Sequence, residues 1–260
     1  VIMGVPNLKP ALFSLEYTSE NASMLPALIN TVIMTVMSLV VAVPVGIFSA
    51  IYLVEYAKRG NKLVGVVRIT AETLSGIPSI VYGLFGYLFF GVSLGWSYSM
   101  IGGALTMSIM ILPLIMRTTE EALMSVPDSF REGSFGLGAG KLRTVFRIIL
   151  PSALPGVMTG LILAMARGAG EVAPLMVTGV VKLAPSLPID GEGPFIHLER
   201  KFMHLGFHIY DVGFQSPDSD AAQPMVFATT LLLILLVVVM NLTAILIRNR
   251  LRKKYAASSF

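Results

Sequence analysis

Long apolar runs with almost no charge recur along this chain and constrain its fold more than any other feature. Each run reaches roughly 20 residues or more, enough to cross ~30 Å of hydrocarbon as a helix. With 55% hydrophobic and 13% charged residues among 260, the chain is too apolar for a soluble domain of its length. A helix satisfies its own backbone hydrogen bonds in lipid, and the runs are too long for barrel strands. The sequence therefore predicts an all-α polytopic membrane protein.

We predict five membrane spans from these runs. They cover about residues 25–54, 73–94, 99–116, 152–181 and 224–247. The chain begins at Val1, and no cleavable signal pattern precedes the first run, so we expect an N-terminally trimmed form.

The basic residues predict how the spans are oriented. Most of the 19 lysines and arginines lie between spans one and two, between spans three and four, and after span five. If the spans alternate, these segments share one side, which the positive-inside rule makes cytoplasmic. The predicted organisation is therefore an external segment 1–24, a transmembrane domain 25–247 with a cytoplasmic loop 125–151 and an external loop 182–223, and a basic cytoplasmic tail 248–260. Basic residues clustered beside apolar spans also argue against nucleic-acid binding.

The cytoplasmic loop predicts a helix–turn–helix elbow. Ser125 is a candidate N-cap, Pro127 suits a first helical turn, and Asp128 suits the positive end of the helix. Phe130, Ser134 and Leu137 then share a face, and three glycines, Gly136, Gly138 and Gly140, break the helix.

A second short helix is expected after the glycines, because Leu142, Phe146 and Leu150 recur every four residues. The resulting apolar ridge lies outside the hydrocarbon and needs a protein partner to cover it. The glycines imitate a phosphate loop, but Phe135 and Leu142 stand where that motif needs glycine and serine or threonine. We therefore expect no ATP to bind this chain there.

Arg167 and Glu171 stand in a span that is otherwise free of charge. Arg167 lies ~24 Å along an ideal helix from Pro151, too deep for easy snorkelling to the cytoplasmic surface. At positions i and i+4 the two side chains share a face and partly neutralise each other. Arg167 is therefore a candidate to bind an oxyanion on a substrate pathway, with Glu171 holding it in place; a structural ion pair between helices is the alternative.

Other residues predict packing rather than chemistry. Gly91-x3-Gly95 and Gly156-x3-Gly160 are spaced for close helix approach. Four glutamates near span ends are expected to form solvated interfacial pairs: Glu55, Glu72, Glu120 and Glu121. His204 and His208 have the spacing of a helical metal pair but no completing ligand, so they are expected to be solvated loop residues. The chain has no cysteine, and we predict neither a metal site nor catalytic residues.

The cytoplasmic loop resembles that of ABC-transporter permeases. Its residues Glu132-Gly-Ser-x3-Gly138-x9-Ile148-x-Leu150-Pro151 match the pattern E-A-A-x3-G-x9-I-x-L-P, with Gly133 and Ser134 replacing the alanines. The strings Leu74-Ser-Gly-Ile-Pro-Ser-Ile-Val-Tyr-Gly83 and Ala166-Arg-Gly-Ala-Gly-Glu-Val-Ala-Pro-Leu175 are similar to those of the phosphate-specific PstA branch of the type I importer permeases. The likeness extends from about residue 25 to the C-terminus.

The resemblance implies a type I ABC importer permease fold of the MetI-like kind, with a sixth span before Val1. It implies a bacterial or archaeal plasma-membrane subunit of a phosphate importer that works with a PstC-like sister permease, two cytoplasmic ATPase subunits and an external phosphate-binding protein. ATP and magnesium would be used by the partner ATPase, and no cofactor would be bound by this chain. The resemblance further implies a pathway role for Arg167 and Glu171 and ATPase coupling through Glu132, Gly138, Phe130, Leu137 and Leu142.

Three other functions remain open from the residues. The first is an ABC permease for another oxyanion or small solute. The second is an intramembrane enzyme, although neither an HExxH nor a GxSxG motif is present. The third is a carrier driven by an ion gradient, whose transport would survive loss of the ATPase.

Overall fold

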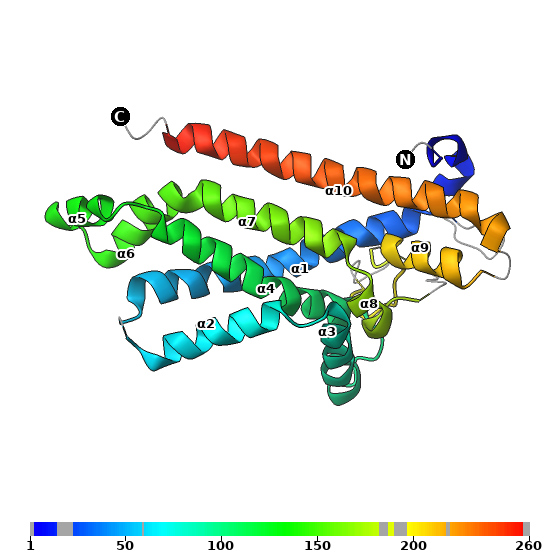
Figure 1. Ribbon diagram of the computed structural model, residues 1–260, viewed down its shortest axis with the longest axis horizontal. Helices are drawn as coiled ribbons and strands as arrows, with labels where there is room; N and C mark the ends of the chain where they lie inside the picture. The colour runs from blue at the N-terminus through cyan, green and yellow to red at the C-terminus, as the bar shows by residue number, and fades with distance from the viewer. Residues whose placement is uncertain are drawn as a thin grey trace. The chain divides into compact units, whose positions relative to one another are not determined.

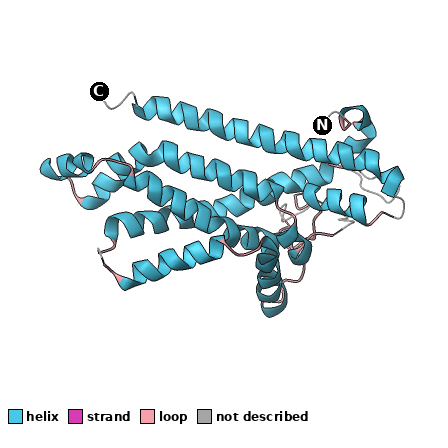
Figure 2. Cartoon of the chain, viewed as in Figure 1, coloured by secondary structure: helices cyan, strands magenta, loops and turns pink. Residues whose placement is uncertain are grey.

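A computed structural model describes residues 3–14, 23–58, 60–181, 187–189, 197–216 and 219–256 of the chain. Within these ranges the regular secondary structure is helical (Figure 2). Val180 and Phe202 form an isolated parallel β-bridge. The all-α fold class is confirmed. Residues 1–2, 15–22 and 59, parts of the predicted external loop at 182–186, 190–196 and 217–218, and residues 257–260 lie outside the described residues.

Figure 1 shows the helices in chain order. Two short 3₁₀ helices come first, at Val5–Asn7 and Pro10–Phe13. The α-helices are α1 (Leu25–Ile51), α2 (Lys62–Ser75), α3 (Ser79–Gly86), α4 (Met100–Met124), α5 (Asp128–Gly136), α6 (Lys141–Thr144), α7 (Leu150–Gly170), α8 (Ala173–Thr178), α9 (Leu205–Phe214) and α10 (Ser219–Ala256). Three π-helical segments extend α1, α3 and α6, at Tyr52–Tyr56, Tyr87–Ser93 and Val145–Ile149.

Four helical segments of the described chain are long and apolar enough to cross a membrane: Leu25–Tyr56, Met100–Met124, Lys141–Gly170 and Ala222–Lys253. A bent pair, Lys62–Ser75 with Ser79–Ser93, makes a fifth if it counts as one span. The five predicted spans therefore all correspond to apolar helical segments, and the second and fourth are interrupted by a break in the helix.

The second predicted span, 73–94, is not one straight helix. The chain breaks at Gly76, Ile77 and Pro78 between the flanking helices. Pro78 lacks an N–H donor and disfavours helical geometry at the residue before it, so α2 ends and Pro78 becomes the N-cap of α3. The apolar stretch thus spans two helices with a turn between them.

The fourth predicted span, 152–181, does not coincide with one continuous helix. Its helical run starts at Lys141 and ends at Gly170, and α8 follows after a break at Glu171 and Val172. Pro174 has no N–H to donate to the carbonyl of Gly170, so one hydrogen bond of a continuous helix would be missing at this point. The helix is thus interrupted between Gly170 and Ala173.

The chain divides into two compact units. The first comprises Val1–Leu39, Ile77–Ile109 and Arg167–Val239; the second comprises Val40–Gly76, Met110–Ala166 and Met240–Phe260.

In the first unit α9 is held by buried polar contacts. His204 caps α9, its Nδ1 accepting from the Gly206 N–H at 3.1 Å, and the Leu205 N–H donates to Thr31 Oγ1 of α1 at 3.0 Å. His208 Nδ1 lies 3.3 Å from Thr229 Oγ1 of α10. Both histidine side chains are 0% exposed, so the prediction of solvated loop residues is wrong. They help to fix α9 against α1 and α10.

In the second unit, glycine brings α4 and α7 together. A Cβ at Gly156 would lie 2.7 Å from Ala122 Cβ, and one at Gly160 would overlap the Thr118 side chain. The predicted close approach at this glycine pair is confirmed. At Gly91 and Gly95 it is wrong, because Gly95 has a φ of +71° with nothing nearby.

Ion pairs also link helices of the second unit. Glu120 of α4 pairs with Arg68 of α2 and is buried, and Glu55 is paired and buried as well. The expectation of solvated pairs is therefore wrong for these two glutamates. Glu72 fits the expectation, because its Oε1 lies 4.0 Å from Arg117 Nη1 and its side chain is mostly exposed.

Acidification is expected to destabilise the first unit through its two buried histidines. Burial lowers the pKa of His204 to about 4, and it lowers the pKa of His208 to about 4 against the attraction of Asp211. The unfolded chain binds more protons below its ordinary histidine pKa near 6.5, so stability is complete above that value and falls between pH ~6.5 and ~4, on the order of 1 kcal/mol per pH unit per histidine. Thermal unfolding of the purified protein against pH measures this loss.

The control for the acid effect is His204→Asn, which keeps an N-cap side chain without a titrating ring. It should flatten the pH dependence by roughly half. An equally steep dependence in this variant would contradict the assignment.

Filling the contact between α4 and α7 is expected to destabilise the second unit. Gly160→Val should lower stability by about 1–3 kcal/mol, because the new side chain overlaps Thr118. Gly133→Ala is the matched control: it adds a Cβ within α5 where nothing lies within 4 Å, and should raise stability by up to about 1 kcal/mol. Thermal unfolding in detergent compares them. Equal tolerance of both changes would count against the close approach.

Candidate functional site

The first half of the elbow is α5. Asp128 opens this helix, and Pro127 is its N-cap without a side-chain hydrogen bond. The prediction that Ser125 caps the helix is wrong: its hydroxyl donates to the Ala122 carbonyl at 2.8 Å and thereby satisfies the end of α4 instead. The proline fixes an extended backbone between the two helices, which leaves Asp128 at the positive end as expected.

The turn of the elbow is built on glycine. The helix ends at Gly136, and Gly138 has a φ of +80°, a conformation that favours glycine. Its N–H donates to the Phe135 carbonyl at 2.9 Å, and the Ala139 N–H donates to the Ser134 carbonyl at 3.1 Å. The predicted helix-breaking role of the glycines is confirmed.

A buried hydrogen bond joins the two arms of the elbow. Ser134 Oγ and Thr144 Oγ1 lie 2.8 Å apart, and both side chains are buried. Ser134 is one of the two residues that replace an alanine of the sequence pattern. The replacement therefore adds a link between α5 and α6 that alanine would lack.

The sequence predicted a separate short helix as the second arm, and this prediction is wrong. Lys141–Gly170 is one helical run, in which α6 passes through a π-helical segment into α7. The elbow is thus the direct extension of a span. Leu142 and Phe146 are 64% and 39% exposed, and the Phe146 ring lies near that of Phe48, with centroids 6.4 Å apart.

The elbow exposes a group of large apolar side chains. Phe130 is 43% exposed, Leu137 91% and Leu142 64%, and Glu132 and Gly138 are also on the surface. Phe135 is 46% exposed and belongs to the same group, although the sequence reasoning did not include it. These exposed groups are the surface that a protein partner would cover.

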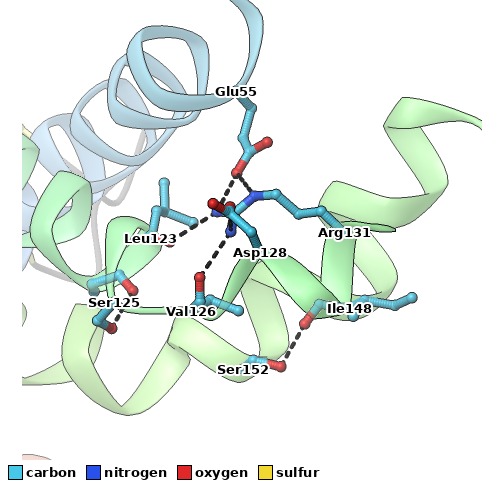
Figure 3. Close-up of polar contacts among 9 residues, drawn as sticks. Glu55, Leu123, Ser125, Val126, Asp128, Arg131, Ile148 and Ser152 are labelled. Atoms are coloured by element: carbon cyan, nitrogen blue, oxygen red, sulfur yellow. Dashed lines mark hydrogen bonds and ion pairs between the residues drawn. The ribbon is translucent and has the colours of Figure 1, made fainter. Parts of the chain in front are cut away.

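Arg131 anchors α5 and was missed by sequence reasoning (Figure 3). Its Nε and Nη2 donate to Glu55 Oε1 at 3.1 and 2.7 Å, and Nη1 donates to Asp128 Oδ1 at 3.1 Å. The carbonyls of Val126 and Leu123 accept from Nη1 and Nη2 at 2.8 and 3.0 Å. The only local signal was the three-residue spacing to Asp128, because Glu55 is far away in sequence.

The charged pair predicted in the fourth span is formed at the end of α7. Arg167 Nε donates to Glu171 Oε1 at 3.4 Å, and the two side chains are 36% and 18% exposed. Gly168, beside Arg167, faces Thr35 of α1 and Met107 of α4. The pair is half-buried, and its contact is long for a charge-assisted hydrogen bond.

Tyr82 of α3 belongs to the same neighbourhood. Its side chain is buried. Gly83 next to it touches α8, since a Cβ there would lie 2.6 Å from the Cα of Pro174. Two strings that the sequence flagged separately, Leu74–Gly83 and Ala166–Leu175, therefore meet in the first unit.

Residues 42–253 match the family described as binding-protein-dependent transport system inner membrane component. This match covers most of the chain. The chain belongs to this family of ABC importer permeases.

Curated relatives agree with this assignment. The chain is 34% identical over 238 residues to the probable ABC transporter permease protein YqgI of Bacillus subtilis, covering 89% of this chain and 79% of that protein. It is 35% identical over 222 residues to phosphate transport system permease protein PstA 1 of Mycobacterium tuberculosis, covering 85% and 69%.

Solved structures show the same fold. A methionine ABC transporter, MetNI, in an inward-facing conformation has a chain that matches with a TM-score of 0.65 at 20% identity, covering 87% of this chain and 93% of that one. A bacterial alginate ABC transporter matches with a TM-score of 0.64 at 15% identity, covering 97% and 85%. The permease is therefore a multi-pass inner-membrane transport subunit with the expected type I importer fold.

The hydrogen bond between Ser134 and Thr144 should stabilise the elbow of this permease. Ser134→Ala and Thr144→Val should each cost about 1 kcal/mol, and the double variant should cost less than their sum by about 0.5–1.5 kcal/mol. Unfolding of the four proteins measures the cycle. Ser152→Ala, which removes a hydroxyl bonded to the Ile148 carbonyl at 2.7 Å, is the control and should be additive with Thr144→Val. Additivity of Ser134→Ala with Thr144→Val would contradict the link.

Proposed function

We propose that this permease is the membrane-spanning subunit of an ATP-driven inorganic phosphate importer. The observation that carries the proposal is its identity of 35% over 222 residues to a phosphate transport system permease protein. Two further proteins named phosphate transport system permease protein PstA, of Mycobacterium leprae and Pasteurella multocida, are 38% and 37% identical over shorter stretches. The chain supplies the translocation path, and a separate ATPase subunit supplies the energy.

In this function Arg167 binds the phosphate oxyanion. A guanidinium offers paired N–H donors that match two oxygens of a tetrahedral oxyanion. Its contact with Glu171 is a single 3.4 Å hydrogen bond, and its side chain is 36% exposed, so donors remain available for a ligand. Glu171 neutralises the arginine when no phosphate is present and repels the anion after it has bound. The pair thus favours transient binding over trapping.

The elbow couples the permease to the ATPase. Its exposed apolar side chains, among them Phe130, Leu137 and Leu142, would be covered by that subunit on the cytoplasmic side. Glu132 and Gly138 mark the loop, Gly138 through its turn and Glu132 as an exposed charge beside the apolar group. ATP and magnesium bind the ATPase, and the complex also contains a PstC-like sister permease, a second ATPase copy and an external phosphate-binding protein.

The proposed orientation places the elbow and the C-terminus in the cytoplasm. It rests on the concentration of lysine and arginine in those segments, including Lys141, Arg143 and Arg147 at the elbow. Both features then lie where an ATPase can reach them.

Arg167→Ala is expected to reduce ATP-dependent phosphate uptake at least tenfold, because the path loses its anion-binding group. Glu171→Gln should also reduce uptake, since the arginine then holds phosphate without a competing charge. Uptake of labelled phosphate into vesicles with the complete complex measures both.

The matched control is Arg248→Ala, which removes an exposed arginine of α10 that contacts Thr159 at 3.3 Å. It should leave uptake within about twofold of the unaltered complex. Intact uptake in both the Arg167 and the Glu171 variants would remove the pathway role. Competition by sulfate or molybdate at the binding protein would change the assigned cargo while leaving ATP coupling in place.

A further inference from the structure

We infer that Arg131 is the positioning residue that transmits movement of α5 to the transmembrane helices of its own unit. This inference rests on the proposed coupling of the elbow to an ATPase and adds the part of the chain that carries the motion inward. The residues involved belong to the second compact unit.

The first support is geometric. Arg131 and Glu132 are neighbours on α5 but differ in environment, since the Arg131 side chain is 15% exposed and Glu132 lies on the surface. Consecutive helical side chains diverge by about 100°. Glu132 therefore faces a partner, whereas Arg131 faces the permease itself.

The second support is the set of groups that Arg131 holds (Figure 3). Glu55 belongs to the π-helical end of the first span, and the carbonyls of Leu123 and Val126 belong to the end of α4 and the connection after it. Asp128 lies on α5 itself. A single planar side chain thus joins three parts of the unit through five hydrogen bonds: the end of the first span, the end of α4 and α5. A shift of α5 therefore displaces the ends of the other two helices.

Burial makes this junction stiff. Glu55 is 8% exposed and would be left as an uncompensated buried charge if Arg131 moved away. The displacement passes on from α4, because Glu120 is buried and pairs with Arg68 of α2. The series runs from α5 through α1 and α4 to α2.

An exposed pair in the same unit provides the contrast. Arg117 and Glu72 lie 4.0 Å apart, and their side chains are 47% and 71% exposed. Solvated pairs of this kind contribute little and move freely. The same substitution at the two arginines therefore separates transmission from a general effect of charge.

Arg131→Lys tests the inference, because lysine keeps the charge but cannot hold several partners in a plane. In the complete complex, assembly and basal ATP hydrolysis should stay within about twofold, whereas the phosphate moved per ATP should fall about fivefold or more. Arg117→Lys should leave this ratio unchanged. An unaltered ratio in an assembled Arg131→Lys complex would overturn the inference.

A chemical link provides the rescue. The chain has no cysteine, so Glu55→Cys with Arg131→Cys introduces the only thiols of this subunit, and the other subunits are made cysteine-free. A short bifunctional thiol linker should restore at least half of the transport ratio, and reduction of the linker should abolish the gain. No recovery in a fully linked, assembled complex would overturn the inference as well. If Arg131→Lys fails to assemble, Glu55→Gln, which keeps an uncharged acceptor, is measured in its place against the same outcomes.

The two proposals fail separately. Absence of ATP-dependent phosphate uptake in the unaltered complex would reject phosphate as the cargo. The ratio of solute to ATP measured with another transported solute would still test Arg131.

Discussion

The constraint on which this structure depends is that backbone N–H and C=O groups in hydrocarbon must find partners within the chain. Helices satisfy this constraint. The two breaks in the apolar segments occur where the sequence reduces the number of unsatisfied backbone groups. Pro78 follows the break after α2, and Pro174 follows the break after α7. Each proline removes one donor that the break would otherwise leave without a carbonyl. At Gly76–Pro78 and beside Glu171 the chain thus leaves the helix with fewer unsatisfied groups than an ordinary break would cause.

Apolar composition predicted the helical class and the regions of the spans, because it reports directly on the solvent that each segment meets. It did not predict where helices end, since that depends on single residues. The Gly76-Ile77-Pro78 string is part of the resemblance to known permeases, but the hydropathy stays high across it. The prediction therefore placed one uninterrupted span there. The opposite error occurred between Lys141 and α7. Charged residues there suggested that one helix ends before another begins, but the helix is continuous.

In the elbow, features set by neighbouring residues were predictable, whereas contacts between residues far apart in sequence were not. Its glycine turn was predictable, because a φ of +80° at Gly138 is a local demand. Arg131 was not, since Glu55 lies on another helix and no periodicity connects them. Ser134 was noted only as a departure from a pattern, and its value depends on Thr144 across the turn. His204 and His208 were misjudged similarly: short polar stretches suggest solvent, but their rings are buried against α1 and α10.

Two arginines in this permease illustrate how saturation of a side chain limits what it can do. The guanidinium of Arg131 makes five hydrogen bonds, and its partner Glu55 is 8% exposed, so a ligand would have to displace several buried contacts to reach it. Arg167 meets Glu171 through one 3.4 Å contact and is more exposed. A group held on all sides transmits displacement, whereas a group held on one side exchanges partners. The same chemistry therefore suits rigid coupling at the elbow and transient anion binding at the end of α7.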